Sequence, residues 1–374
     1  MKKSLVLIVL TVTSLLTFAQ PPRPAPTPND TLKPVSVSAD NALTFRVYAP
    51  NASSVTISGD FKNGYPAVAM NRESNGVWSY TTAPMQPDLY SYDLTIDGVH
   101  TLDPKNMHYK EAESHLSNLF LMPGKQSEYC ATLDVPHGNI QQVWFYSKIT
   151  EKHTRFHVYT PPVFEKIKKP LPVLYLQHGG GDNDASWTTI GRANFILDNL
   201  YAAGKILPMV VVMPMGHPTS GFFMNPGIDE DPYYKQLFEE IMPLVSQKFH
   251  VSADRYKTAY AGLSMGGLQA LNIAIFAPEK FGYVMPLSTG YFPAQRQMLE
   301  EKYSAQLRNP EINKLKLFWI SMGGETDIAY ANGKAVNDIL TRYGIRYQTH
   351  SYPAGHTFLT WRHDLETFAP MLFR

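Results

Sequence analysis

The sequence predicts two domains: a small all-β sandwich, followed by an α/β sheet with helices on both faces. Three observations lead to this prediction. The chain has 374 residues, about twice the length of an average domain. Its first third contains short runs in which apolar and polar residues alternate, without helical periodicity. Further on, continuous apolar runs are separated by helical patterns, as in parallel strands that are covered on both sides.

Composition and charge describe an ordinary globular protein. Hydrophobic residues make up 44% of the chain and charged residues 17%, and the formal net charge is +1. This near-neutral balance gives no reason to expect a nucleic acid, an anionic lipid or a strongly acidic substrate as partner. The single cysteine, Cys130, cannot form an intramolecular disulfide. With no Cys/His cluster and no H-E-x-x-H motif, neither a metal nor another cofactor is expected.

Residues 1–19 have the pattern of a secretory signal peptide. Lys2 and Lys3 form a basic start, Leu5–Leu16 is an apolar stretch, and Thr17–Ala19 resembles a small-x-small cleavage site. A membrane span is the competing interpretation, but the apolar stretch is short and interrupted by polar residues. We therefore expect an exported protein, periplasmic or secreted, without a stable membrane anchor.

A proline-rich segment, residues 20–34, and the first domain, residues 35–122, are expected next. Pro21–Pro34 contains six prolines in fourteen residues, which favours an extended tether. The first domain has alternating runs of the kind found in half-buried strands, and Asp97-Gly98 is a typical hairpin turn. The clearest runs are Leu43–Val47, Val55–Ile57 and Tyr90–Ile96. Short strands between turn signals indicate a β-sandwich.

Residues 123–140 are interpreted as a linker and residues 141–374 as the α/β domain. The linker contains turn-forming residues such as Pro123-Gly124 and Pro136. The α/β domain is expected to open with an antiparallel pair of strands before the parallel part of the sheet begins. The expected strands are Val143–Ser147, Thr154–Thr160, Leu171–Gln177, Met209–Met213 and Leu315–Ile320.

A G-x-S-x-G motif, Gly262–Gly266, joins a strand-like run to a helical one. This context is the one that the nucleophile-elbow motif requires. The turn is so sharp that side chains two positions either side of Ser264 would collide, which explains the two glycines. The Met265 N–H, at the start of the helix, is expected to face a developing oxyanion. A tight glycine turn with an ordinary serine is the alternative.

A serine nucleophile needs a base and an acid, which in this fold follow it in the order Ser, Asp or Glu, His. Glu325 and Asp327 follow the strand-like run Leu315–Ile320, so both are candidates for the acid. His356 follows the extended run at residues 345–350 and is the expected base. Two histidines compete with it: His350, within that run, which we interpret as structural, and His363, in a helical pattern near the C-terminus.

The second oxyanion donor is expected in the loop His178–Gly181, directly after a buried strand. Its glycine-rich sequence is similar to the HGGG loops of esterases, and we assign the donor to the Gly180 N–H. A phosphate-binding loop is the alternative interpretation. No Gly-Lys-Ser/Thr follows these glycines, which argues against it.

These motifs resemble the esterase D-like group of α/β hydrolases, and within it carbohydrate esterase family 1, the feruloyl and acetylxylan esterases. The likeness covers residues 141–374. Its most specific sign is Gly355-His356 followed five residues later by Trp361-Arg362. In that family the Gly-x-x-Asp spacing favours Asp327 over Glu325 as the acid. The first domain resembles the early-set immunoglobulin-like domain through Phe45–Ala52, Gly76–Trp78, Tyr90–Tyr92, Asp97-Gly98 and Asp103-Pro104.

The resemblance implies hydrolysis of an ester between a plant cell-wall polysaccharide, such as arabinoxylan, and ferulate or acetate. The polysaccharide or an oligosaccharide would be the partner, and the oligomeric state stays open. Residues 215–232 depart from the family's usual loop, which leaves the acyl group open. A siderophore esterase of the enterochelin type and a catalytically silent glycan-binding protein are the alternative functions. Candidates to line the substrate cleft are Trp187, Phe222, Phe223, Tyr330 and Trp361.

Overall fold

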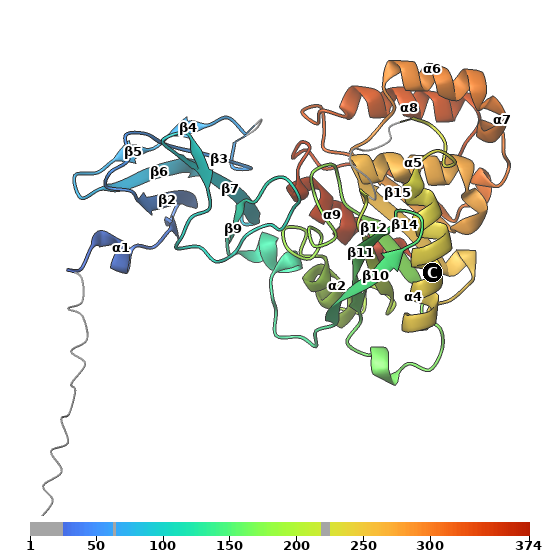
Figure 1. The fold of residues 1–374 in the computed structure, drawn as a ribbon, viewed down its shortest axis with the longest axis horizontal. Coiled ribbons are helices and arrows are strands. Elements are labelled where there is room, and N and C mark those ends of the chain that lie inside the picture. The colour runs from blue at the N-terminus through green and yellow to red at the C-terminus, as the bar shows by residue number, and fades with distance from the viewer. Residues whose placement is uncertain (1–24, 63–64, 218–224) are drawn as a thin grey trace, which may run out of the picture.

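The computed structural model describes residues 25–62, 65–217 and 225–374 (Figure 1). The expected signal peptide, residues 1–19, lies outside these ranges, as do Phe222 and Phe223. Figure 1 shows an all-β domain, blue to teal, beside a larger domain that runs from green to red. This is the predicted order of fold classes. No helix in the described ranges is long and apolar enough to cross a membrane.

The N-terminal domain is a sandwich of two antiparallel sheets that enclose one hydrophobic core. One sheet has the order β1-β2-β6-β5, and the other has the order β4-β3-β7-β8, with β9 also paired to β7. Inward-facing Phe45, Ile57 and Tyr92 lie in this core, as the alternation of apolar residues predicts. The strands are β1 Val35–Val37, β2 Ala42–Tyr48, β3 Val55–Gly59, β4 Val68–Ala69, β5 Asn71–Arg72, β6 Val77–Pro84, β7 Leu89–Ile96, β8 Val99–Thr101 and β9 Asn118–Leu121.

The expected extended tether is not extended throughout. Residues 28–31 form a single-turn helix, α1 Pro28–Thr31. Proline at the first helical position has the backbone angle that a helix needs, and Asp30 accepts a hydrogen bond from the Thr27 N–H at 2.6 Å. The prediction of an extended segment is therefore wrong for residues 28–31, because Pro28 starts a helix.

The described residues of the second domain form an eight-stranded sheet, ordered β10-β11-β13-β12-β14-β15-β16-β17. The β10–β11 and β11–β13 pairs are antiparallel and the remaining pairs are parallel. The predicted antiparallel start of the sheet is thus confirmed. The strands are β10 Asn139–Ser147, β11 Lys152–Thr160, β12 Val173–Gln177, β13 Val210–Pro214, β14 Thr258–Leu263, β15 Tyr283–Leu287, β16 Leu317–Met322 and β17 Gln348–Ser351.

Helices cover both faces of this sheet. Side chains of α4, α5 and α8 share one core with alternate strand residues such as Tyr175, whereas α2 and α9 share a second core with Leu174 and Leu176. Strands buried on both faces explain the continuous apolar runs of the sequence. The helices are α2 Ala193–Ala202, α3 Pro232–Lys235, α4 Met242–Phe249, α5 Met265–Phe276, α6 Pro293–Lys302, α7 Ser304–Leu307, α8 Tyr330–Arg342 and α9 Phe358–Phe368, with the π-helical turn η3 Gln236–Ile241 between α3 and α4.

The segment between the domains, predicted as a linker, packs against the second domain. Its short helix η1, Lys125–Cys130, buries Cys130. Asn199 on α2 donates hydrogen bonds to the carbonyls of residues 128, 129 and 131, and Arg192 donates to the Cys130 carbonyl at 2.5 Å. The segment is therefore a fixed part of the domain junction.

Candidate active site

Ser264 occupies a strained turn between β14 and α5. Its φ is +53°, a conformation that costs free energy for a residue with a Cβ. The flanking glycines have no room for a side chain: a Cβ on Gly262 would lie 2.3 Å from the Gly266 carbonyl oxygen, and one on Gly266 would lie 2.5 Å from the His178 carbonyl oxygen. The structure thus has the steric crowding that the motif predicts.

Ser264, His356 and Asp327, which come from separate loops, form one chain of contacts. His356 Nε2 lies 2.9 Å from Ser264 Oγ, and His356 Nδ1 lies 2.8 Å from Asp327 Oδ1. Asp327 is in the loop after β16 and His356 in the loop after β17, so parallel neighbouring strands deliver both to one edge of the sheet. Glu325, the other candidate acid, is exposed.

The surroundings of Asp327 favour its ionised form. Burial by itself would raise the pKa of Asp327, but hydrogen bonds with His356, Ser288 and the Ala329 N–H together lower it to about 2. The Gly323 N–H also donates to Asp327 Oδ2 at 2.9 Å. A carboxylate held in this way can accept the Nδ1 proton of His356, which leaves Nε2 free to accept a proton from Ser264.

Trp361, the fourth residue of α9, orients this arrangement. Its indole packs edge-on against the His356 ring, with the ring centroids 5.1 Å apart, and Nε1 donates to Ser288 Oγ at 2.9 Å. Because Ser288 also contacts Asp327, Trp361 holds both the histidine and the partner of the acid.

The loop after β12 lies against the serine turn. A Cβ on Gly179 would lie 3.3 Å from the Ser264 Cβ, and Gly180 lines the cavities on both sides of Ser264. Buried His178 fixes the loop: Nδ1 donates to the Gly179 carbonyl at 2.8 Å, and Nε2 accepts from the Gly216 N–H at 2.9 Å. Burial lowers the pKa of His178 to about 4, so it stays neutral and keeps both bonds.

Two cavities open beside Ser264. One, of about 460 Å³, is mainly apolar and is lined by Met265, Leu268, Phe292 and Ile328. The other, of about 430 Å³, is more polar and includes side chains from the N-terminal domain. An ester bond placed at Ser264 would thus have one substituent in an apolar space and the other in a polar one.

Comparison with known families supports this picture. Residues 147–372, more than half of the chain, match the model of the esterase family. The chain belongs to this family. Residues 34–109 of the esterase match the model of carbohydrate-binding module 48, the isoamylase N-terminal domain.

The esterase is also similar to individual proteins. An endo-1,4-beta-xylanase/feruloyl esterase of Xylanibacter ruminicola is 36% identical over 345 residues, which cover 90% of this chain but only 46% of that protein. The feruloyl esterase module of Clostridium thermocellum has a TM-score of 0.57 at 20% identity and covers 72% of this chain and 97% of that one. Enterobactin esterase of Shigella flexneri has a TM-score of 0.67 at 20% identity, and the match covers 89% of this chain and 92% of that one. The two structural likenesses show a shared fold.

Of the five residues expected to line the cleft, the three that lie within the described ranges have different positions in the esterase. Trp361 lines the polar cavity. Trp187 is 1% exposed, and its Nε1 donates to the Gln177 carbonyl within the core beneath the active site. Tyr330 begins α8 and packs on the hydrophobic core, while its neighbours Ile328 and Ala329 line the apolar cavity. Large aromatic side chains near a site often pack beneath it, and sequence position alone does not reveal this.

The two competing histidines lie outside the triad. His350 stacks on Trp319, with the ring centroids 5.1 Å apart. His363 on α9 lies 2.8 Å from Asp88 Oδ2 in the N-terminal domain. The stacking of His350 fits the structural role that the sequence suggested for it, and His363 connects α9 to the N-terminal domain.

The sequence analysis missed the contribution of the N-terminal domain to the site. Tyr65, Asp93, Lys110 and His115 line the polar cavity together with Ser264. The loop between β8 and β9, residues 102–117, carries two of them to the second domain. No motif marks these residues, because their proximity to Ser264 depends on how the two domains pack.

The 102–117 loop binds the loop His178–Gly181 directly. The backbone N–H groups of Glu113 and Ser114 donate to the Gly181 carbonyl at 3.1 and 3.3 Å. Lys110 forms an ion pair with Asp182 at 2.5 Å. The position of the Gly180 loop is therefore coupled to the N-terminal domain.

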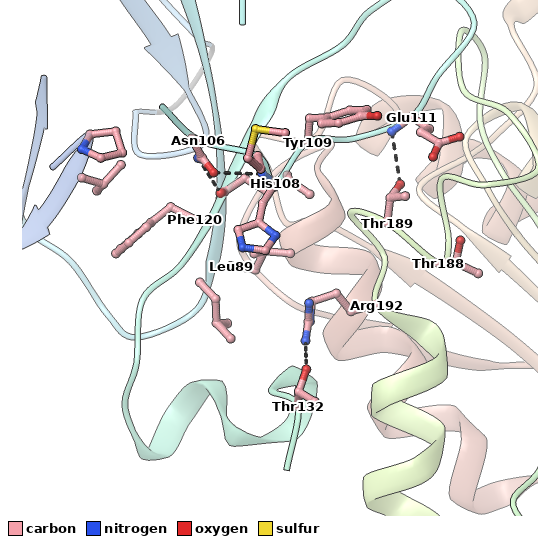
Figure 2. A pocket seen from close by; sticks show the side chains of 15 residues that line it. Leu89, Asn106, His108, Tyr109, Glu111, Phe120, Thr132, Thr188, Thr189 and Arg192 are labelled. Carbon is pink, nitrogen blue, oxygen red and sulfur yellow. Dashed lines mark hydrogen bonds between the residues drawn. The ribbon is translucent and has the colours of Figure 1, made fainter. Parts of the chain in front are cut away.

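A third cavity, of about 670 Å³, lies where the domains meet (Figure 2). Figure 2 shows Arg192 reaching Thr132 of the connecting segment, at 2.8 Å, and the Glu111 N–H donating to Thr189 Oγ1 at 3.3 Å. None of the residues that line this cavity belongs to the triad. It marks the domain junction rather than the reaction site.

Proposed function

We propose that the protein is a serine carboxylic-ester hydrolase that releases ferulate from acylated xylan through an acyl-enzyme on Ser264. The observation that carries this proposal is the chain of contacts from Ser264 Oγ to His356 at 2.9 Å and from His356 to Asp327 at 2.8 Å. A hydroxyl, an imidazole and an ionised carboxylate in this order are the components of serine acyl transfer.

In the proposed reaction, Ser264 Oγ attacks the ester carbonyl while His356 Nε2 takes the hydroxyl proton. Asp327 stays ionised, fixes the histidine tautomer and stabilises the imidazolium. The N–H groups of Gly180 and Met265 are the proposed donors to the oxyanion. His356 then gives its proton to the departing sugar oxygen, and water, activated by His356, releases the acid from the serine.

The apolar cavity is the proposed acyl site and favours an aromatic acid over acetate. Phe292 is 47% exposed and Ile328 is 81% exposed, both at this cavity. A feruloyl ring would remove part of this apolar surface from water, at roughly 25 cal/mol per Å². An acetyl group has one methyl and would leave most of the cavity of about 460 Å³ unfilled.

The polar cavity is the proposed site of the sugar part. Ser58, Tyr65 and Lys110 offer charged or hydrogen-bonding groups there. A sugar carries many hydroxyls that can pair with such groups. The match of residues 34–109 to a carbohydrate-binding module and the name of the Xylanibacter relative both support a xylan-derived substrate.

A siderophore esterase is the second candidate, favoured by the TM-score of 0.67 to enterobactin esterase. The anionic iron complex of such a siderophore would call for a basic cavity. In the described part of the chain, Lys110 is the one Lys or Arg among the residues of the polar cavity, and Asp182 neutralises it. The side chains of the cavity by themselves therefore suit a neutral sugar better than an anionic complex.

The decisive experiment compares the wild type with Ser264→Ala on methyl ferulate and on a feruloylated arabinoxylan oligosaccharide. We expect the variant to lose about six orders of magnitude in kcat, as serine hydrolases do without their nucleophile. A fluorophosphonate probe should label the wild type on Ser264. Ser53→Ala, an exposed serine in the N-terminal domain, is the matched control. Near-normal turnover by Ser264→Ala would refute the mechanism.

Separate assays test the substrate. We expect the kcat/KM for ferulate release from xylan fragments to exceed that for acetate release, and enterobactin to be a poor substrate. Faster acetate or enterobactin hydrolysis that still depends on Ser264 would refute the acyl assignment and leave the esterase mechanism standing. We also propose export, on the signal-like residues 1–19.

A further inference from the structure

Two histidines and a buried aspartate meet on the N-terminal domain, at the wall of the polar cavity. Asp93 is on β7, His100 on the neighbouring strand β8, and His115 in the loop 102–117. His100 Nε2 lies 3.3 Å from Asp93 Oδ1, and His115 Nε2 lies 3.1 Å from Asp93 Oδ2. The two imidazole rings lie close together, with centroids 4.7 Å apart and planes tilted by 42°. His100 follows Asp93 by seven positions and His115 follows His100 by fifteen, a spacing that no metal motif describes.

We propose that Asp93, His100 and His115 bind a divalent zinc-type cation. Their candidate ligand atoms all lie within 4.8 Å of one another. Zinc bonds of about 2.0–2.1 Å in tetrahedral geometry place neighbouring ligand atoms about 3.3 Å apart. The two nitrogen–oxygen separations, 3.3 and 3.1 Å, are close to this value. The two imidazoles approach different oxygens of the same carboxylate, and one donor atom from each residue lies within reach of a single small ion after small side-chain rotations.

The state of Asp93 is a second, independent observation. The residue is 8% exposed, and its buried Oδ1 accepts no hydrogen bond within the described part of the chain, although His100 Nε2 lies 3.3 Å away. A buried carboxylate oxygen without a hydrogen bond is costly. A cation bound between this oxygen and the imidazoles would give the oxygen the partner that it lacks.

The donor set selects the class of ion. Two imidazole nitrogens and a carboxylate suit zinc and neighbouring late first-row metals, whereas calcium and magnesium prefer oxygen ligands alone. Three protein ligands leave one tetrahedral position for water or another oxygen. Asp93 and His115 both line the cavity that contains Ser264, so this position lies beside the proposed sugar site.

The cation would also fix the loop that contacts the oxyanion side of the active site. It would connect β7 and β8 to His115, and residues 113 and 114 of the same loop donate to the Gly181 carbonyl. The site therefore has a structural consequence that does not depend on which ester the enzyme hydrolyses.

The test is isothermal titration of the chelator-treated, dialysed full chain with zinc chloride alone. We expect one zinc ion per chain. His100→Ala and His115→Ala should each weaken binding by at least about 100-fold, because even outer-shell partners contribute 10–100-fold to metal affinity. The control is His108→Ala, an exposed histidine of the same loop outside the cluster, which should bind like the wild type. Absence of stoichiometric binding, or equal binding by all variants, would overturn the proposal.

A second readout keeps the test decisive if a variant is unstable. Zinc should raise the unfolding temperature of the wild type and of His108→Ala, but not of His100→Ala or His115→Ala. Cobalt(II) bound to the wild type should show the intense visible absorption of a four-coordinate ion. The weak spectrum of the hydrated ion would overturn the proposal even if the variants cannot be purified.

Discussion

Replacing Arg362 by alanine should destabilise the protein by about 3–5 kcal/mol, because it removes one partner of a buried ion pair. Arg362, on α9, is fully buried at the domain junction. Its guanidinium donates to Asp88 Oδ1 at 3.1 Å, to the Leu89 carbonyl at 2.5 Å and to the Ile190 carbonyl at 3.0 Å. Alanine would leave the Asp88 carboxylate and both carbonyls without these donors.

Urea unfolding monitored by fluorescence measures the effect. The matched control is Arg342→Ala, since Arg342 is 55% exposed and pairs with Glu300 at the surface, where water screens the pair and its loss should change stability little. We also expect the double variant Arg362→Met/Asp88→Asn to lose less free energy of unfolding than the sum of the losses in the two single variants. If domain docking is lost, a second transition should appear in the unfolding curve.

The reasoning is refuted if Arg362→Ala and Arg342→Ala lose the same free energy of unfolding. That result would mean that water or a rearranged side chain replaces the buried guanidinium without cost. Additive effects of the Arg362 and Asp88 changes would show that the two side chains do not stabilise each other, despite their 3.1 Å contact.

Two further predictions concern buried groups near the site. Burial raises the pKa of Asp364 to about 8. Between about pH 4 and pH 8 the folded state therefore binds one more proton than the unfolded state. As pH rises through this range, the free energy of unfolding should fall by up to about 1.4 kcal/mol per pH unit. Asp364→Asn should flatten this slope in urea unfolding at several pH values, and an unchanged slope would contradict the assignment. Gly266→Ala should lower kcat by at least about tenfold, because its Cβ would lie 2.5 Å from the His178 carbonyl oxygen and displace the loop His178–Gly181 beside Ser264. Gly204→Ala, whose Cβ meets no atom within 4 Å, is the control and should leave kcat unchanged, whereas equal kcat values in both variants would contradict the steric argument.

Local sequence rules predicted much of the second domain. The apolar run at residues 171–177 became β12, and the run at 315–320 overlaps β16, because strands buried on both faces must be apolar throughout. The G-x-S-x-G turn was predictable for a different reason. Its two glycines are required by contacts within a few residues and with one adjacent loop, and these contacts are the same wherever the turn occurs.

Contacts with distant parts of the chain decided what the sequence did not reveal. Trp187 and Tyr330 were expected in the cleft, but both pack against the core. The segment at residues 123–140 has the composition of a linker, yet Arg192 and Asn199 bind its carbonyls and hold it against α2. Turn-forming residues indicate irregular structure and carry no information about what that structure packs against.

The sequence by itself determined the two fold classes, the strand-to-helix turn at Ser264, and the order in which a base and an acid follow it. Each of these depends on periodicity or on steric limits within a short stretch of chain. Only the tertiary structure decided that Asp93 and His115 of the β-sandwich line the cavity of the second domain. That proximity depends on buried contacts between domains, such as Arg362 with Asp88, whose partners are 274 residues apart.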